Sequence, residues 1–321
     1  MKLNLNSQFL LYLLCISIVS CSTDNIAEEV LNDEEQGETD PIPNPEENSA
    51  RLAAKALYED YYQASITTTE VPWTGNEASC DAGSVPKGTI DKILMRLEYY
   101  RKAVGLNNEI TEDATKSAKA QQTALMMNAN NALEHFPPNS WKCYTADGDE
   151  GAGKSLLALT RNAEAIDAYI QDQGSANGPV GHRRWLLWPR LQEIGIGNTD
   201  RSNAIWVLGD SGPVPVDNPE FIAWPPEGYV PANLAFPRWS FSVASADFST
   251  TTVSMKDADG ASIQLSLETL SNDFGDRTIV WVPEGISTNA ADTSYTVTLK
   301  DVGIGGELTT FEYEVILFDA E

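Results

Sequence analysis

The feature that most constrains the fold is a change of periodicity near residue 210. Before it, apolar residues recur at helical spacing over residues 90–104 and again over 111–133. After residue 238, apolar and polar residues alternate, which is the period of a strand with one buried face. The alternation repeats often enough for about six or seven short strands. We therefore predict an α+β chain whose helical part precedes an all-β, immunoglobulin-like sandwich over residues 238–321.

Shorter patterns complete the helical part. Residues 51–65 and 162–171 carry apolar residues near helical spacing, whereas residues 193–197 and 203–208 have the pattern of an antiparallel strand pair. Residues 210–237 are rich in proline and aromatic residues and show little periodicity. We predict that this last segment is a connector that lies against a surface.

The N-terminus has the composition of an export signal. Lys2 precedes an apolar run over residues 9–19 that is too short to span a bilayer as a stable helix. The residues before Cys21 resemble the lipobox of bacterial lipoproteins, so residues 1–21 are expected to be a signal peptide and Cys21 the lipidated residue. The alternative is an ordinary secretory signal with an incidental cysteine, and both interpretations predict export.

Charge is concentrated after this signal. Residues 22–50 hold ten acidic residues and no Lys or Arg, and they are too polar to bury a core, so we predict a disordered acidic tether. The whole chain has a formal charge of -26. Such a charge argues against nucleic acid as a partner, because phosphate contacts need clustered Lys and Arg. It also argues against electrostatic adsorption to anionic lipid.

Two cysteines remain in the part that is expected to fold. Cys80 and Cys143 would form an isolated pair in an exported chain, and the simplest use of such a pair is one disulfide. The bridge would close a long loop and contribute roughly 3–4 kcal/mol to stability on the chain-entropy estimate.

The chain contains only two histidines, and both lie in the helical part. His135 follows the helix predicted over 111–133 and opens a predicted loop over 136–153, whereas His182 follows a loop rich in Gly and Asn. Histidine is the side chain most often used for proton transfer and metal binding near neutral pH. The two residues therefore indicate a site, although each could equally be a hydrogen-bonded residue of the core.

One apparent motif is rejected. Residues Gly148–Ser155 fit the phosphate-binding pattern G-x-x-x-x-G-K-[ST]. That mechanism needs a buried strand before the loop and a helix after it, whereas the preceding residues are polar and include Cys143. Asp149 and Glu150 would also repel a triphosphate. We therefore do not expect the chain to bind nucleotide.

The order of several short motifs resembles the CAP superfamily, which comprises cysteine-rich secretory, antigen 5 and pathogenesis-related 1 proteins. These motifs are Tyr99-Tyr100-Arg101, Leu133-Glu134-His135, Ala165-Ile166-Asp167-Ala168-Tyr169, Gly181-His182 and Ile194-Gly195-Ile196-Gly197. More narrowly, Trp73-Thr74-Gly75, Trp141-Lys142-Cys143 and Trp224-Pro225-Pro226 are similar to the bacterial lipoprotein version. The resemblance implies a three-layer α-β-α sandwich for a CAP-like domain over residues 51–209.

The resemblance also implies a cleft with two histidines and two acids. His135 and His182 match the histidines, and Asp172 plausibly matches the second acid. Lys154 stands where the family has its first acid, so Asp149 or Glu150 would have to supply that carboxylate. The candidate catalytic residues are therefore His135, His182, Asp172 and Glu150. Further candidates are Arg183 and Ser155 as ligand-binding residues, and the two histidines as ligands of a divalent metal such as zinc.

Three functions follow as hypotheses. The first is an exported, lipid-anchored CAP-domain protein whose two-histidine cleft binds a small ligand, a lipid or a divalent metal without catalysis. The second is a metal-dependent hydrolase of peptide or cell-wall material. The third is a surface module that binds a glycan or a protein partner. All three place the protein in the periplasm or on the cell surface, held to the membrane through Cys21.

Overall fold

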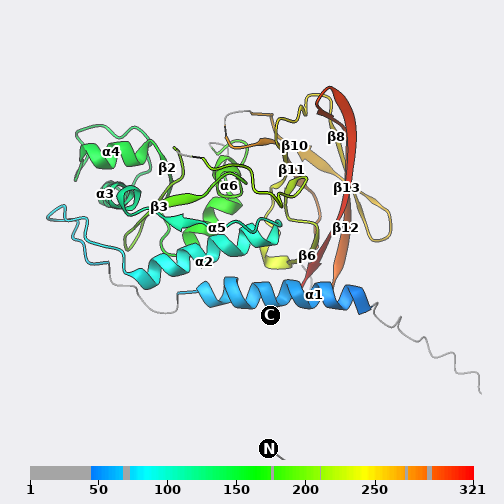
Figure 1. The fold of residues 1–321 in the computed structure, drawn as a ribbon, viewed down its shortest axis with the longest axis horizontal. Coiled ribbons are helices and arrows are strands. Elements are labelled where there is room, and N and C mark those ends of the chain that lie inside the picture. The colour runs from blue at the N-terminus through cyan, green and yellow to red at the C-terminus, as the bar shows by residue number, and fades with distance from the viewer. Residues whose placement is uncertain (1–44, 68–72, 175–176, 210, 272–273, 288–290) are drawn as a thin grey trace, which may run out of the picture. The chain divides into compact units, whose positions relative to one another are not determined.

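The computed structural model describes residues 45–67, 73–174, 177–209, 211–271, 274–287 and 291–321 (Figure 1). The chain divides into two units, Met1–Ile42 and Pro43–Glu321, and the helices and strands reported below belong to the second unit. The predicted signal peptide, Cys21 and most of the predicted tether lie outside the described residues. Within the described ranges, no helix is both long enough and apolar enough to cross a membrane.

The predicted helices form, with shifted ends. The helices are α1 (Pro45–Leu57), α2 (Lys87–Ala103), α3 (Ala114–Asn130), α4 (Ala146–Ala152), α5 (Glu164–Gln171) and α6 (Gly181–Leu186), with a π-helical turn η1 (Tyr58–Tyr62) and 3-10 turns η2 (Gln63–Ser65) and η3 (Ala232–Leu234). Because α1 begins at Pro45, residues 45–50 are helical and do not belong to a disordered tether. Helix α4 also corrects the prediction of an uninterrupted loop over 136–153.

The first sheet lies at the centre of the helical part. Its four strands have the order β1 (Thr111–Glu112), β3 (Glu193–Asn198), β4 (Asn203–Trp206) and β2 (Ser155–Ala158). The predicted antiparallel pair is confirmed, because β3 pairs with β4 through the register Ile196 to Ile205. Strand β2 pairs antiparallel with the other edge of β4, and β1 pairs parallel with β3.

Helices cover both faces of this sheet. On one face, Leu157 and Ala204 pack with Ala120 and Ala124 of α3. On the other face, neighbouring strand residues such as Leu156 pack against the apolar residues of α2 and α5. Successive strand residues point to opposite faces, so this division places the sheet between two layers of helix. The result is the predicted α-β-α arrangement (Figure 1).

Two glycines allow α3 to lie unusually close to the sheet. A Cβ atom at Gly197 would lie 2.0 Å from the Ala120 carbonyl oxygen, and one at Gly195 would lie 2.5 Å from the backbone of Lys116. Real side chains do not tolerate such distances, so only glycine fits at both positions. This contact explains the small residues that repeat along α3.

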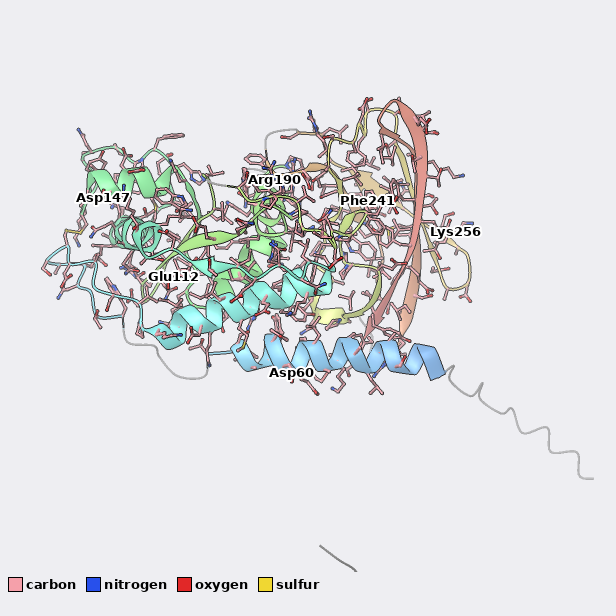
Figure 2. The ribbon with its side chains drawn as sticks, in the orientation of Figure 1. Asp60, Glu112, Asp147, Arg190, Phe241 and Lys256 are labelled. Atoms are coloured by element: carbon pink, nitrogen blue, oxygen red, sulfur yellow. A yellow bond between two sulfur atoms is a disulfide. The ribbon has the colours of Figure 1, made fainter. Side chains whose placement is uncertain are left out.

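The C-terminal part consists of two packed sheets. One sheet has the strand order β10 (Leu265–Leu267), β11 (Arg277–Pro283), β7 (Trp239–Val243), β5 (Ile222–Trp224), and the other has the order β6 (Gly228–Pro231), β13 (Glu307–Phe318), β12 (Thr293–Ile304), β8 (Thr252–Asp257), β9 (Ser262–Ile263). Phe241 lies inside this sandwich, and Lys256 is exposed at its outer edge (Figure 2). A turn at Asp259-Gly260 joins β8 and β9, with Gly260 at a φ of +80°.

Part of the predicted connector over 210–237 belongs to the C-terminal sandwich. It contributes β5 to one sheet and β6 to the other, where β6 runs parallel to β13. The same segment also joins the helical part, because Trp224 packs edge-on against Tyr100 of α2 at a centroid distance of 4.9 Å. One core therefore continues from the α-β-α part into the sandwich.

Candidate functional site

A cavity of about 360 Å³ opens where α6, β2 and the loop after α3 meet the sandwich. Its lining residues are His135, Phe136, Gly153, Ser155, Leu156, Asn177, Gly178, Gly181, His182, Trp185, Val207, Leu208 and Phe274. The structure thus brings the only two histidines of the chain to the same cavity. The walls are mainly apolar, with a few polar groups among them, which is the usual composition of a small-molecule site.

His135 reaches the cavity because α3 ends abruptly. Asn131 adopts the left-handed conformation that closes the helix, and the chain then turns toward α4. The Nδ1 atom of His135 lies 2.8 Å from the Ala152 carbonyl oxygen at the end of α4. A carbonyl only accepts hydrogen bonds, so Nδ1 carries the hydrogen and Nε2 of the neutral ring is an acceptor.

His182 is fixed by a buried carboxylate. Asp172 is 0% exposed and follows α5 in the left-handed conformation, with φ +50°. Its Oδ2 atom accepts the backbone N–H of His182, and its Oδ1 atom accepts Nδ1–H of the same residue, both at 2.8 Å. In the neutral imidazole, the Nε2 atom of His182 is thereby left as an acceptor, which is the same tautomer as in His135.

Ser155 adds a hydroxyl group to this cavity. It is the first residue of β2 and only 3% exposed. Its Oγ atom has no hydrogen-bond partner among the residues that the structure describes. A buried hydroxyl without a partner is costly, so a hydrogen bond to a ligand that reached this atom would be favourable.

Residues 94–208 match the family model "CAP: Cysteine-rich secretory protein family". The chain contains a CAP domain. The matched segment includes both histidines, Asp172 and Ser155. A search of the curated proteins finds no match to this chain.

Within the CAP domain, Lys154 does not take the place of the family acid in the cavity. Gly153 and Ser155 on either side of it are lining residues, whereas the Lys154 ammonium lies 5.4 Å from the centre of the Trp206 ring. The pattern Gly148–Ser155 runs through helix α4 and then into strand β2. This order is the reverse of the strand, loop and helix that cradle a phosphate.

Glu150 does not replace the missing acid either. Its exposed carboxylate forms a salt bridge of 2.5 Å with Lys119, and it lies outside the lining of the cavity. The hydrogen bond from Lys119 lowers the pKa of the Glu150 carboxyl. The interpretation of Glu150 as a catalytic residue is therefore not supported by its position.

Arg183 is a structural residue and not a ligand contact. It is 1% exposed and donates hydrogen bonds to the Ile170 carbonyl at 2.6 Å, to the Arg238 carbonyl at 2.8 Å and to Ser240 Oγ at 2.9 Å. Burial lowers the pKa of this guanidinium to about 9. Arg183 thus links α5 and α6 to strand β7 and is directed away from the cavity.

The donor set of the cavity does not fit a zinc ion. Neither Nε2 atom has a hydrogen-bond partner among the described residues, and the Nδ1–H group of each ring is held by an acceptor, as in many metal sites. Zinc sites, however, use three or four protein ligands. The described part of the chain contains no group of three or more His, Cys, Asp or Glu residues placed to hold a metal. We therefore derive no step through a metal ion.

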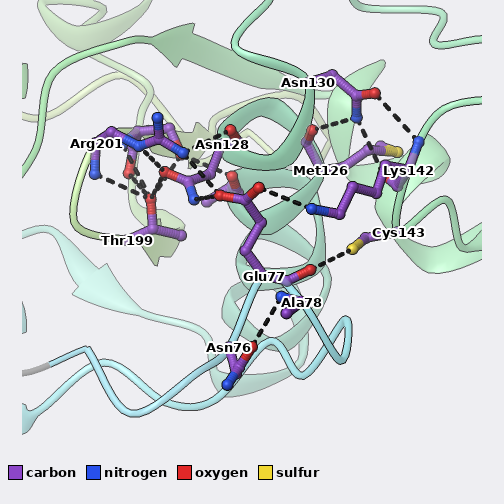
Figure 3. Close-up of polar contacts among 12 residues, drawn as sticks. Asn76, Glu77, Ala78, Met126, Asn128, Asn130, Lys142, Cys143, Thr199 and Arg201 are labelled. Atoms are coloured by element: carbon purple, nitrogen blue, oxygen red, sulfur yellow. Dashed lines mark hydrogen bonds and ion pairs between the residues drawn. The ribbon is translucent and has the colours of Figure 1, made fainter.

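The predicted disulfide is confirmed. Cys80 and Cys143 are joined at an S–S distance of 2.05 Å. The bridge holds the loop before α2 against the CAP domain together with Glu77, whose carboxylate contacts Lys142 at 2.8 Å and Arg201 at 2.7 Å (Figure 3). The Glu77 backbone oxygen lies 3.5 Å from Sγ of Cys143. This cluster stabilises the fold and contributes no residue to the cavity lining.

The aromatic walls of the cavity, Phe136, Trp185 and Phe274, were not predictable from the sequence. Phe136 is 82% exposed at the cavity, directly after His135. Phe274 comes from the loop before β11, far away in sequence. An isolated aromatic residue in a loop rich in small and polar residues was the one available signal for Phe274.

Proposed function

We propose that this CAP-domain protein binds a small apolar molecule that carries a hydroxyl group. The observation that carries the proposal is that His135, His182 and Ser155 line one cavity with mainly apolar walls. Each Nε2 atom accepts a hydrogen bond, whereas the Ser155 hydroxyl can donate or accept. A ligand hydroxyl matches this set because it can donate to an imidazole and accept from Ser155. A carboxylate matches it less well because it only accepts.

Three naphthalene probes test the proposal. We expect 2-naphthol to bind more tightly than naphthalene by roughly tenfold, the value of one net hydrogen bond, and more tightly than 2-naphthoate. Ser155→Ala and His182→Phe should each reduce the preference for 2-naphthol over naphthalene. Lys87→Ala is the matched control, because Lys87 is exposed, pairs with Asp91 and does not line the cavity.

Calorimetric or fluorescence titration gives the dissociation constants. Failure of all three probes to bind, or equal binding of 2-naphthol and naphthalene, would refute the proposal. EDTA in the buffer should leave the constants unchanged, since the two imidazoles lack a third protein ligand for a metal among the described residues. A loss of binding in EDTA would instead favour the metal-binding hypothesis.

A second candidate function is hydrolysis with His182 as a general base. The pairing of Asp172 with Nδ1 and the free Nε2 atom favour it, because this arrangement orients an imidazole for proton transfer. In this candidate, Nε2 takes a proton from water as the water attacks a carbonyl. Turnover of p-nitrophenyl acetate that is lost in His182→Gln and kept in His135→Gln would support it. A wild-type rate equal to that of buffer would reject it for this substrate.

We also propose that Cys21 is lipidated, so that the protein is held at a membrane in the periplasm or on the cell surface. The residues before Cys21 and the similarity to bacterial lipoproteins support this proposal. Incorporation of a clickable palmitate analogue should be lost in Cys21→Ser. In the same proposal the C-terminal part is an immunoglobulin-like sandwich, which its two packed sheets support.

A further inference from the structure

The loop that leads into β11 is fastened to α6 on both sides of Phe274. Arg184 of α6 donates hydrogen bonds to the Ser271 carbonyl at 3.3 Å and to the Asp276 carbonyl at 2.9 Å. Trp188, just after α6, donates from Nε1 to the Asp276 carboxylate at 3.2 Å. The guanidinium of Arg184 also lies 5.7 Å from the centre of the Phe274 ring. These contacts fix the aromatic ring relative to the CAP domain.

Two glycines let the loop and the helix approach each other. A Cβ atom at Gly181 would lie 3.2 Å from the ring of Phe274, so the ring packs directly on the backbone beside His182. Gly275 has a φ of +49°, and a Cβ atom there would lie 2.9 Å from the Arg184 carbonyl oxygen. A larger residue at either position would push the ring away from α6. The close contact is therefore a property of this sequence.

From these contacts we infer that the C-terminal sandwich is part of the binding site, with Phe274 as a residue that determines specificity. Phe274 lines the cavity together with Trp185 and Phe136, so aromatic rings from the CAP domain and from the sandwich face the same space. Aromatic rings attract other flat rings by offset stacking or edge-to-face contact. The site would accordingly select hydroxyl-bearing ligands with a flat ring system. This inference rests on the proposed function, because it concerns the ligand of the same cavity.

The selectivity is measured with a pair of probes that differ in flatness. The pair is 2-naphthol and decahydro-2-naphthol, which share a hydroxyl and a fused two-ring carbon skeleton, but only the first is planar. We expect Phe274→Leu to reduce the preference for 2-naphthol by about three- to tenfold, which is the usual range for one aromatic pair. Leu308→Ala is the control, because Leu308 is an exposed apolar residue of the same sandwich. An unchanged preference in Phe274→Leu would overturn the inference.

A second measurement needs no ligand. The chain has only two histidines, so modification by diethyl pyrocarbonate followed by mass spectrometry reports on each imidazole separately. Removal of the wall in Phe274→Ala should raise the rate at His182, which is 20% exposed, and leave the already exposed His135 unchanged. An unchanged rate at His182 in a folded variant would show that Phe274 is no wall of the site. If the probes do not bind the wild-type protein but the modification rate at His182 rises in Phe274→Ala, the proposed function is refuted. The inference that the sandwich supplies a wall of the cavity then still stands.

Discussion

Replacement of Asp172 by Ala should both destabilise the protein and free the ring of His182. Asp172 is fully buried and accepts two hydrogen bonds from His182, each at 2.8 Å. A buried donor left without an acceptor costs about 1–3 kcal/mol. For the Nδ1–H donor of His182 we expect a cost near the lower limit of this range, because the side chain is 20% exposed. Ala in the left-handed conformation costs roughly 1–2 kcal/mol more. Recovery of carboxylate hydration offsets part of this sum, so we expect a loss of roughly 2–4 kcal/mol.

Asp172→Asn separates these contributions. Asn tolerates the left-handed conformation and keeps one side-chain oxygen as an acceptor, so its loss of stability should be smaller than that of the Ala variant. Denaturant titration measures the free energy of unfolding for both variants. Long-range ¹H–¹⁵N spectra report the tautomer of each ring, and with two histidines the assignment is simple.

The spectra carry an internal control. Wild-type His182 should show the Nδ1–H tautomer, and Asp172→Ala should give a mixture of tautomers. His135 should keep the Nδ1–H tautomer in both proteins, because its partner is the Ala152 carbonyl. An Asp172→Ala variant with wild-type stability and an unchanged His182 tautomer would show that the carboxylate does not orient this ring.

Three further predictions concern stability. The double variant Cys80→Ser/Cys143→Ser should lose about 4 kcal/mol of unfolding free energy in denaturant titration, since the bridge spans 63 residues, and reductant should affect only the wild type. The hydrogen bond from Lys142 lowers the pKa of Glu77 from its usual 4.5, so this contact stabilises the fold above that pH and is lost as the pH falls through the lowered value. Melting curves of Glu77→Gln between pH 3 and pH 7 should therefore lack this part of the acid destabilisation, and identical curves for both proteins would contradict the assignment. Arg183→Met should lower the unfolding free energy by about 2–4 kcal/mol because three acceptors, two of them buried, lose their donor, and a melting temperature equal to that of wild type would contradict the structural role.

Long periodic segments were predictable from sequence because burial of one face imposes a repeat on the residues. The helices α2 and α3 and the strands β12 and β13 are long enough for that repeat to be visible. The disulfide was also predictable, since the part of the chain that was expected to fold holds two cysteines, which offer one pairing. These features depend on composition and local order, which the sequence contains directly.

Some short elements were not predictable because they lack room for a period. Strand β2 has four residues and all are buried, so it shows no alternation, and β5 has only three residues. Helix α4 carries the glycines Gly148 and Gly151, which are typical of loops. It forms because Thr145 caps its first turn through a hydrogen bond to the Gly148 N–H. A Cβ atom at Gly151 would lie 2.3 Å from the Thr123 hydroxyl of α3, so packing requires glycine there.

The candidate site was predictable in its residue types and not in its partners. Two histidines and the resemblance pointed to His135 and His182, and Asp172 followed as a plausible acid. The acceptor for His135 is a backbone carbonyl, which no residue type reveals. The roles of Glu150 and Arg183 were missed because each depends on a contact with a residue far away in sequence, Lys119 in one case and Ser240 in the other.

The limits of the family match and of the folded unit do not coincide, and this difference bears on function. The match ends at residue 208, yet Trp224 and Phe318 belong to the same apolar core as Tyr100. Helix α1 contacts both parts, because Leu57 packs against the core that includes Tyr100, while Arg51 pairs with Asp292 at 2.9 Å. The sandwich is thus built into the core of the CAP domain and is not a separate module on a linker. Because the two parts share one core, a cavity at their junction takes one wall from each part.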